Sequence, residues 1–188
     1  MNLYVLRHGQ TSMNSQDLIV GTTDDTLTEE GIEQAKDVAK KIAAFEGNNA
    51  VDIVITSPLV RARHTAQIVA DEIERKTGRK IESIIDNRLI EQNYGNLEGT
   101  SRFSEEFAVS RGSYASRTGK TGESILQLAQ RVYNTIDEVK AKFAGKTILF
   151  VTHGGICRVI RSYFYDMTNE EYPAWRALNC QLDKYKLL

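Results

Sequence analysis

The sequence is poor in cysteine and proline, and it has no excess of charge of either sign. Its 188 residues include two cysteines and two prolines, and 24 Lys and Arg stand against 25 Asp and Glu, a formal net charge of −1. Cys157 and Cys180 lie far apart and in no C-x-x-C pair, which argues against a disulfide framework or a structural zinc site. The charge balance gives no overall field to attract nucleic acid or an acidic membrane.

Long apolar runs, targeting signals and repeats are also missing. No stretch approaches the roughly 20 apolar residues that cross a bilayer, and the first residues lack the basic and long apolar regions of a signal peptide. We therefore expect a cytoplasmic protein with reduced thiols and without nucleic-acid or membrane partners. With 41% hydrophobic and 26% charged residues, and no repeat or linker, the chain is expected to form one globular domain over 1–188.

Short apolar runs predict a sheet. Mostly apolar runs at residues 3–6, 51–55 and 148–151, with a weaker one at 81–85, are typical of strands that are buried on both faces of a parallel sheet. Residues 180–187 alternate imperfectly between apolar and polar side chains, and this pattern favours an edge strand.

Helical patterns separate these runs. Apolar residues recur at helical spacing from Thr28 to Phe45, after Pro58, and over 125–143, where an S-x-x-Q capping box precedes the pattern. A fourth helix is expected to start near Ile156. Strands that alternate with helices predict an α/β fold with a mostly parallel sheet.

Cationic and imidazole side chains follow three of the predicted strands. The three strand ends carry Arg7-His8-Gly9-Gln10-Thr11, Ser57-Pro58-Leu59-Val60-Arg61 and His153-Gly154-Gly155. Ligands of such folds sit beyond the carboxyl ends of the strands, so we expect these groups to meet there. Guanidinium groups match phosphate oxygens, glycines let an anion approach a helix N-terminus, and a neutral imidazole is a nucleophile. The pattern predicts a phosphate site in which nearby cations keep one histidine neutral.

Six segments carry recognisable motifs. They are Arg7-His8-Gly9-Gln10-Thr11 with Asn14, the stretch from Gly21 to Gly31, Ser57 to Ala66, Leu89 to Gly99, Gly122-Glu123-Ser124, and Val151 to Gly155. In this order they resemble the histidine phosphatase superfamily, in the branch with cofactor-dependent phosphoglycerate mutases and their phosphatase relatives. The resemblance covers nearly the whole chain. It implies a three-layer sandwich, with helices flanking the mostly parallel sheet and a small cap segment over the site.

The resemblance also implies catalytic roles. His8 would be the nucleophile that carries the phosphoryl group. Glu91 would protonate the leaving oxygen and then activate water. Arg7, Arg61 and His153 would hold the phosphoryl oxygens.

A wider pocket is implied around these groups. The matched pocket residues are Asn14, Gln10, Thr11, Gly21 and Gly154. No histidine pair or carboxylate cluster has the spacing of metal ligands, so no metal is expected. The expected partner is a small phosphate ester, and the protein is expected to be a monomer or a homodimer.

Two reactions share the first half of this chemistry. A phosphatase lets water take the phosphoryl group from His8, whereas a mutase returns it to a bound phosphoglycerate. Mutase relatives usually have a longer insertion before the G-E-S motif, and here 22 residues (100–121) fill that interval. We therefore favour a phosphomonoester phosphatase that acts on a small phosphorylated metabolite and needs no cofactor. The alternative is a mutase primed by 2,3-bisphosphoglycerate; a non-catalytic phospholigand-binding module is disfavoured because both His8 and Glu91 are present.

Several charged residues beside the motifs have simpler explanations. His64 is expected to be a surface or packing residue, and Glu98 is expected to serve a turn. The segment 100–121 is interpreted either as a solvated cap or as a specificity element. In the second case, charge reversal at Arg111 or Arg117 should raise KM for anionic substrates alone.

Overall fold

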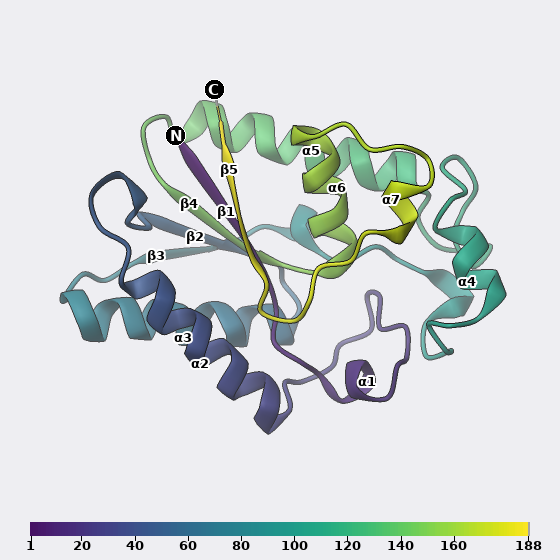
Figure 1. Ribbon diagram of the computed structural model, residues 1–188, viewed down its shortest axis with the longest axis horizontal. Coiled ribbons are helices and arrows are strands. Elements are labelled where there is room, and N and C mark those ends of the chain that lie inside the picture. Colours follow the sequence, from purple (N-terminus) through teal and green to yellow (C-terminus); the bar gives the residue numbers. More distant parts are fainter. Residues whose placement is uncertain (188) are drawn as a thin grey trace.

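A five-stranded sheet forms the centre of the molecule (Figure 1). The computed structural model describes residues 1–187 of the 188-residue chain. The strands are β1 (Asn2–Arg7), β2 (Ile53–Thr56), β3 (Glu82–Ile85), β4 (Ile148–Thr152) and β5 (Leu182–Lys186). Their order in the sheet is β3-β2-β4-β1-β5, in which β5 is antiparallel to β1 and the other neighbours are parallel. The predicted strands, including the edge strand near the C-terminus, and the α/β class are confirmed.

Helices cover both faces of this sheet. Figure 1 shows α2 (Glu29–Ala43) and α3 (Val60–Thr77) on one face, and α5 (Ile125–Lys142) and α6 (Gly154–Phe164) on the other. Short helices α1 (Ser12–Ser15), α4 (Glu105–Ser110) and α7 (Glu171–Ala174) lie in the connections beyond the sheet. Single 3₁₀ turns occupy Gly47–Asn49, Asn87–Leu89 and Gly95–Leu97. The arrangement is the predicted three-layer sandwich.

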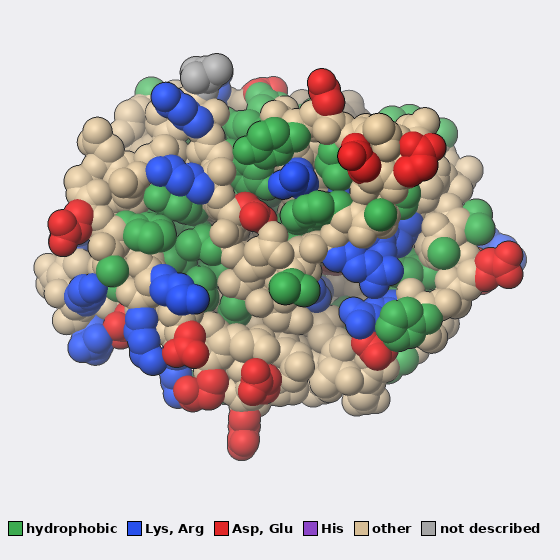
Figure 2. Space-filling model, in the orientation of Figure 1, with side chains coloured by type: hydrophobic (Ala, Val, Ile, Leu, Met, Phe, Trp, Pro, Cys, Tyr) green, Lys and Arg blue, Asp and Glu red, His purple; other side chains and the backbone are tan. Residues whose placement is uncertain are grey.

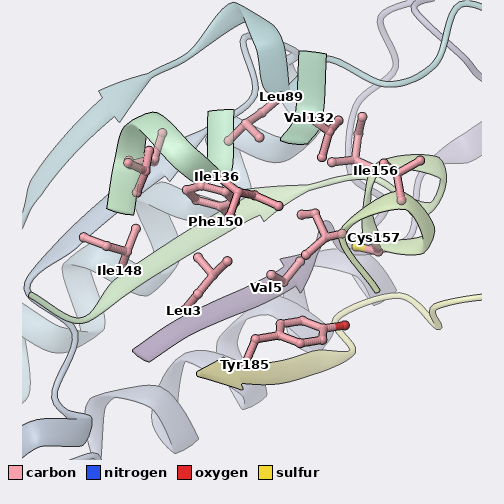
Figure 3. Close-up of a cluster of buried hydrophobic side chains, with 14 of the residues drawn as sticks. Leu3, Val5, Leu89, Val132, Ile136, Ile148, Phe150, Ile156, Cys157 and Tyr185 are labelled. Atoms are coloured by element: carbon pink, nitrogen blue, oxygen red, sulfur yellow. The ribbon is translucent and has the colours of Figure 1, made fainter. Parts of the chain in front are cut away.

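Two hydrophobic cores fill the space between the layers. In β1, Leu3 and Val5 face α5 and α6, whereas Tyr4 and Leu6 face α2 and α3, because successive side chains of a strand point to opposite faces. Figure 3 shows the first core, in which Phe150 of β4 lies among aliphatic side chains. Burial on both faces explains why the central strands are unbroken apolar runs.

Side-chain caps fix where two of the long helices begin. The Thr28 hydroxyl accepts a hydrogen bond from the Gly31 amide at the start of α2, and Ser124 and Gln127 form the predicted capping box of α5. Helix α6 differs from expectation, because it begins at Gly154 rather than near Ile156. His153 has extended backbone, and its carbonyl already accepts the Cys157 amide at 2.8 Å. The glycines therefore form the first turn of the helix.

Candidate active site

The carboxyl ends of β1, β2 and β4 meet at one edge of the sheet. Arg7 pairs with Thr152 and Thr56 with Val151 in the sheet register, so the residues that follow these strands lie level with one another. His8 and His153 are both buried, and their ring centroids are 5.1 Å apart. The sheet thus brings the two histidines together from positions 145 residues apart in the sequence (153 − 8).

Arg61 lies between the two imidazoles. This side chain is 1% exposed, and its Nε–H is shared between His8 Nε2 at 3.3 Å and His153 Nδ1 at 3.2 Å. Its two Nη atoms donate to the carbonyls of Thr23 (2.9 Å) and Gly21 (2.7 Å). The guanidinium is thereby fixed against both histidines from the first turn of α3.

The hydrogen bonds of His8 fix its tautomer. His8 Nδ1 lies 2.7 Å from the Gly9 carbonyl, so Nδ1 carries the proton and the lone pair of Nε2 accepts the Arg61 Nε–H. Burial, and then the charges of Arg61 and Arg7, hold the pKa of His8 well below 6.5. A neutral imidazole is the form that can attack phosphorus.

His153 is held in the neutral form by the same surroundings. Its Nε2 lies 2.6 Å from the Ser57 hydroxyl, and its Nδ1 accepts from Arg61. Burial lowers the pKa of His153 well below 6.5, with further contributions from Arg61, His8 and Arg7. Both histidines are therefore uncharged at neutral pH.

These two histidines are expected to make the folded state sensitive to mild acid. Below about pH 6.5 the unfolded chain protonates both imidazoles whereas the folded chain does not, so the free energy of unfolding falls as the pH drops. The slope is about 1.4 kcal/mol per pH unit for each proton. Urea denaturation between about pH 5.5 and 7.5 should show this fall below pH 6.5 and none above it. His8→Gln should remove one proton from the slope; an unchanged slope in that variant contradicts the assignment.

Arg7 and Glu91 complete the inner part of the site. Arg7 Nη1 donates to the Ala177 carbonyl at 2.8 Å, and its buried Nε has no hydrogen-bond partner within residues 1–187. The Glu91 carboxylate accepts the amides of Gln92 (2.8 Å) and Gly155 (3.0 Å). A Cβ at Gly155 would lie 2.5 Å from Glu91 Oε1, so only glycine lets the start of α6 approach this carboxylate.

One cavity joins these groups. Its lining includes Arg7, His8, Arg61 and Glu91, together with the predicted pocket residues Asn14, Gly21 and Gly154. Glu91 is the only carboxylate among the described residues that line it. Such a lining, rich in guanidinium groups and with one acid, suits a phosphate ester.

Three predicted site residues do not line this cavity. His153 is fully buried, with its ring bonded to Arg61 and Ser57, and the other two are Gln10 and Thr11. Gln10 Oε1 accepts the Thr28 hydroxyl at 3.0 Å, and Thr11 is the N-cap of α1, whose hydroxyl accepts the Asn14 amide. Neither side chain lines the cavity, because the chain turns away from the sheet edge after Gly9 and uses both to anchor the following loops.

Two networks hold the site and were not foreseen from the sequence. The Glu98 carboxylate accepts the backbone amides and the hydroxyls of Thr22 and Thr23, so it fixes the loop whose carbonyls orient Arg61. Glu98 therefore does more than serve a local turn. On the other side, Arg131 of α5 donates to the Glu91 carbonyl (3.2 Å) and pairs with Glu123 (2.8 Å).

Further arginines line the outer part of the cavity. They are Arg102, Arg111, Arg158 and Arg176. The first two belong to the segment 100–121, which carries α4 and packs Phe107 edge-on against Tyr94 at 5.4 Å between ring centroids. One signal in the sequence could have indicated Arg158: a charged residue within the apolar run from Ile156 to Ile160. Arg176 had none.

Comparisons with known proteins identify the family of this chain. The model of the histidine phosphatase superfamily (branch 1) matches residues 3–187. A 2,3-bisphosphoglycerate-dependent phosphoglycerate mutase of Rhizobium meliloti is 32% identical over 90% of this chain and 82% of its own. The phosphoglycerate mutase-like protein 4 of Arabidopsis thaliana is 31% identical over 98% of this chain and 79% of its own. The chain belongs to the histidine phosphatase superfamily.

Solved structures share the fold. The mycobacterial glucosyl-3-phosphoglycerate phosphatase superimposes with a TM-score of 0.81 and 22% identity, covering 97% of this chain and 88% of that structure. The alpha-ribazole phosphatase of Shigella flexneri gives a TM-score of 0.81 and 24% identity, covering 100% and 91% of the two chains. Both likenesses show that this chain shares its fold with these two structures.

Three general features of the described chain complete the description. Residues 1–187 contain no group of three or more His, Cys, Asp and Glu that could hold a metal ion. Within the same residues, no helix is both long and apolar enough to cross a membrane. Cys157 and Cys180 are unpaired.

Proposed function

We propose that this protein is a phosphomonoester phosphatase that acts on a small phosphorylated metabolite through a phosphohistidine at His8. One observation carries the proposal: a neutral His8, protonated on Nδ1, lines a cavity together with Arg7 and Arg61, and Glu91 is the single carboxylate among the described residues of that lining. This set supplies a nucleophile, cations for the phosphoryl oxygens and a group that transfers a proton.

The first half-reaction breaks the ester bond. The His8 Nε2 lone pair forms a bond to phosphorus while the bond from phosphorus to the ester oxygen breaks. A protonated Glu91 gives its proton to the departing oxygen, so the leaving group departs as a neutral alcohol. Arg7 and Arg61 hold the negative charge that is shared by the phosphoryl oxygens in the transition state.

Water completes the reaction. The Glu91 carboxylate takes a proton from a water molecule as the water oxygen bonds to phosphorus, and the bond between phosphorus and His8 breaks. Inorganic phosphate leaves, and both His8 and Glu91 return to their starting states. The short segment 100–121 supports hydrolysis, because a short cover gives water access to the cavity. This cavity opens to the surface of the molecule (Figure 2).

A mutase primed by 2,3-bisphosphoglycerate is the second candidate. It is favoured by the arginines of the outer cavity, which would retain an acidic intermediate long enough for the phosphoryl group to return to it. The residues present fit a bisphosphorylated primer: its reactive phosphate would lie at Arg7 and Arg61, and its second acidic groups at the outer arginines. The primer would supply the phosphoryl group that loads His8.

A phosphate-release screen over diverse monoesters separates the two candidates. It includes 3-phosphoglycerate with and without the bisphosphoglycerate primer. A phosphatase is expected to release phosphate from several esters without the primer. Primer-dependent isomerisation of phosphoglycerate with negligible phosphate release would establish the mutase instead. We also infer that the enzyme is cytoplasmic. Both of its cysteines are free thiols, as is usual in a reducing compartment.

A further inference from the structure

The connection from α7 to β5 passes the carboxyl end of β1 (Figure 1) and bonds to the residues there. The Cys180 amide donates to the carbonyls of Arg7 (3.1 Å) and His8 (3.3 Å). Asn179 adds a contact from its side chain: its Nδ2 donates to the His8 carbonyl at 3.1 Å and to Asn14 Oδ1 at 3.4 Å. One amide group therefore bridges His8 and Asn14.

The backbone of this connection is held in one conformation. Cys180 has a φ of 53°, in the left-handed region that a residue with a Cβ seldom adopts. Such a conformation persists where the surrounding contacts determine it. Here Arg7 Nη1 donates to the Ala177 carbonyl at 2.8 Å, and the Arg7 amide donates to the Gln181 carbonyl at 3.1 Å. Asn179 lies between these contacts in the chain, so its side chain is held at the end of β1.

Hydrogen-bond chemistry fixes which way round the two side-chain amides lie. A backbone carbonyl can only accept, so the Asn179 atom beside the His8 carbonyl is Nδ2. Because Nδ2 can only donate, the Asn14 atom that faces it is Oδ1. The His8 carbonyl thus determines, through Asn179, the orientation of the Asn14 amide.

Asn14 lies at the wall of the cavity. It lines the cavity together with Arg7 and His8, and its backbone is fixed in α1, where its amide donates to the Thr11 hydroxyl at 3.3 Å. No residue of 1–187 accepts a hydrogen bond from Asn14 Nδ2. With Oδ1 directed at Asn179, Nδ2 is the part of the Asn14 amide that is left to meet a ligand in the cavity.

The orientation matters because the two ends of an amide act oppositely on an anion. Phosphoryl oxygens accept hydrogen bonds, so the hydrogens of Nδ2 stabilise them whereas Oδ1 in the same place repels them. The two orientations fill the same volume, and packing alone does not choose between them. The choice depends on the hydrogen-bond partners of the amide, which for Asn14 means Asn179.

We propose that Asn179 is a positioning residue of the active site, which holds the Asn14 amide so that Nδ2, and not Oδ1, faces the phosphoryl oxygens. Asn179 does not line the cavity itself, so it acts through Asn14. This assignment rests on the proposed phosphatase function, because it takes the phosphate to lie beside His8 and Asn14.

A double-mutant cycle tests the assignment. Asn179→Leu keeps a similar volume and removes the donor, and Asn14→Ala removes the group that the donor orients. Each single substitution is expected to lower kcat/KM for p-nitrophenyl phosphate by about 10-fold or more, the loss of one hydrogen bond to an anion. In the Asn14→Ala background, Asn179→Leu should change kcat/KM by less than about threefold. A purely structural role for Asn179 would lower kcat/KM by the same factor in both backgrounds, and that result overturns the assignment.

Asn179→Asp keeps the test valid where Asn179→Leu fails to fold. The carboxylate fills almost the same volume but can only accept, so Asn14 turns its Nδ2 towards it and leaves Oδ1 facing the phosphate. We expect kcat/KM to fall at least as far as in Asn179→Leu; an unchanged value overturns the assignment. Asn169→Leu is the matched control, because Asn169 is an exposed residue that accepts the Tyr114 hydroxyl and lies outside the cavity. Its replacement should leave kcat/KM unchanged.

Binding of inorganic phosphate separates this assignment from the proposed reaction, because calorimetry needs no turnover. Asn179→Leu is expected to raise the Kd of phosphate by about 10-fold in the wild-type background and to leave it unchanged in the Asn14→Ala background. This pattern supports the role of Asn179 even where no ester is turned over, a result that would overturn the phosphatase proposal alone. Phosphate release by an enzyme whose kcat/KM and phosphate Kd are both insensitive to Asn179→Leu overturns the role of Asn179 and leaves the phosphatase proposal standing.

Discussion

His8→Gln is expected to abolish phosphate release. Glutamine fills a similar volume, but its amide nitrogen has no lone pair that can bond to phosphorus. Loss of a covalent nucleophile from an otherwise intact site lowers kcat by about 10⁴-fold or more. Steady-state assays of the two proteins, with phosphate release as the readout, measure this loss.

His64→Gln is the matched control for this variant. His64 is exposed on α3, three residues after Arg61, and no described residue bonds to its ring. The same substitution there should leave turnover unchanged. In the unmodified enzyme, rapid quenching in alkali followed by mass spectrometry should locate the phosphoryl group on the peptide that contains His8. Turnover that survives in His8→Gln, or a phosphoryl group on another residue, refutes the phosphohistidine mechanism.

The sequence predicts the fold well because the fold depends on local patterns. Unbroken apolar runs mark β1, β2 and β4, and a helical repeat of apolar residues marks α2, α3 and α5. The predicted proximity of His8, Arg61 and His153 follows from the prediction of these strands. Parallel strands put their carboxyl ends at one edge, so residues directly after them become neighbours whatever their separation in the chain.

The rest of the site depends on contacts that leave no local pattern. Glu98 acts through Thr22 and Thr23, 76 and 75 residues away in the sequence. Arg111 is placed by a carbonyl 64 residues away. Such contacts are decided by how loops pack on one another, and a single sequence carries no record of that packing. The segment after β1 shows that a motif does not by itself place a side chain in the cavity. Gln10 and Thr11 belong to a motif, but they anchor loops and do not line the cavity.

Substitution of Glu91 has an effect that depends on the leaving group. Glu91→Gln cannot donate a proton to the departing oxygen. For an alkyl ester such as glycerol 3-phosphate, whose leaving group is strongly basic, kcat/KM is expected to fall by about 10²- to 10⁴-fold. For p-nitrophenyl phosphate the leaving phenolate needs no proton, so kcat/KM should fall much less. Parallel measurements on the same protein preparation give the two ratios.

This comparison also separates chemistry from structural damage. The Glu91 carboxylate accepts the amides of Gln92 and Gly155, and a glutamine side chain has one oxygen to accept them. Any loosening of the start of α6 therefore lowers kcat/KM for both substrates alike. Equal losses with the two esters would mean that Glu91 acts only by holding the helix.

The second half-reaction gives an independent sign of the same role. kcat/KM reports the steps up to cleavage of the ester bond, whereas kcat also includes attack of water on the phosphohistidine. Without the Glu91 carboxylate to activate that water, hydrolysis of phospho-His8 becomes slow while its formation from p-nitrophenyl phosphate continues. Glu91→Gln should therefore release a burst of nitrophenol that approaches one equivalent per site, followed by a slow steady state. A burst in this variant would place Glu91 in both halves of the reaction. The phosphohistidine accumulates only if it still forms while its hydrolysis, which needs the Glu91 carboxylate as a base, has become slow.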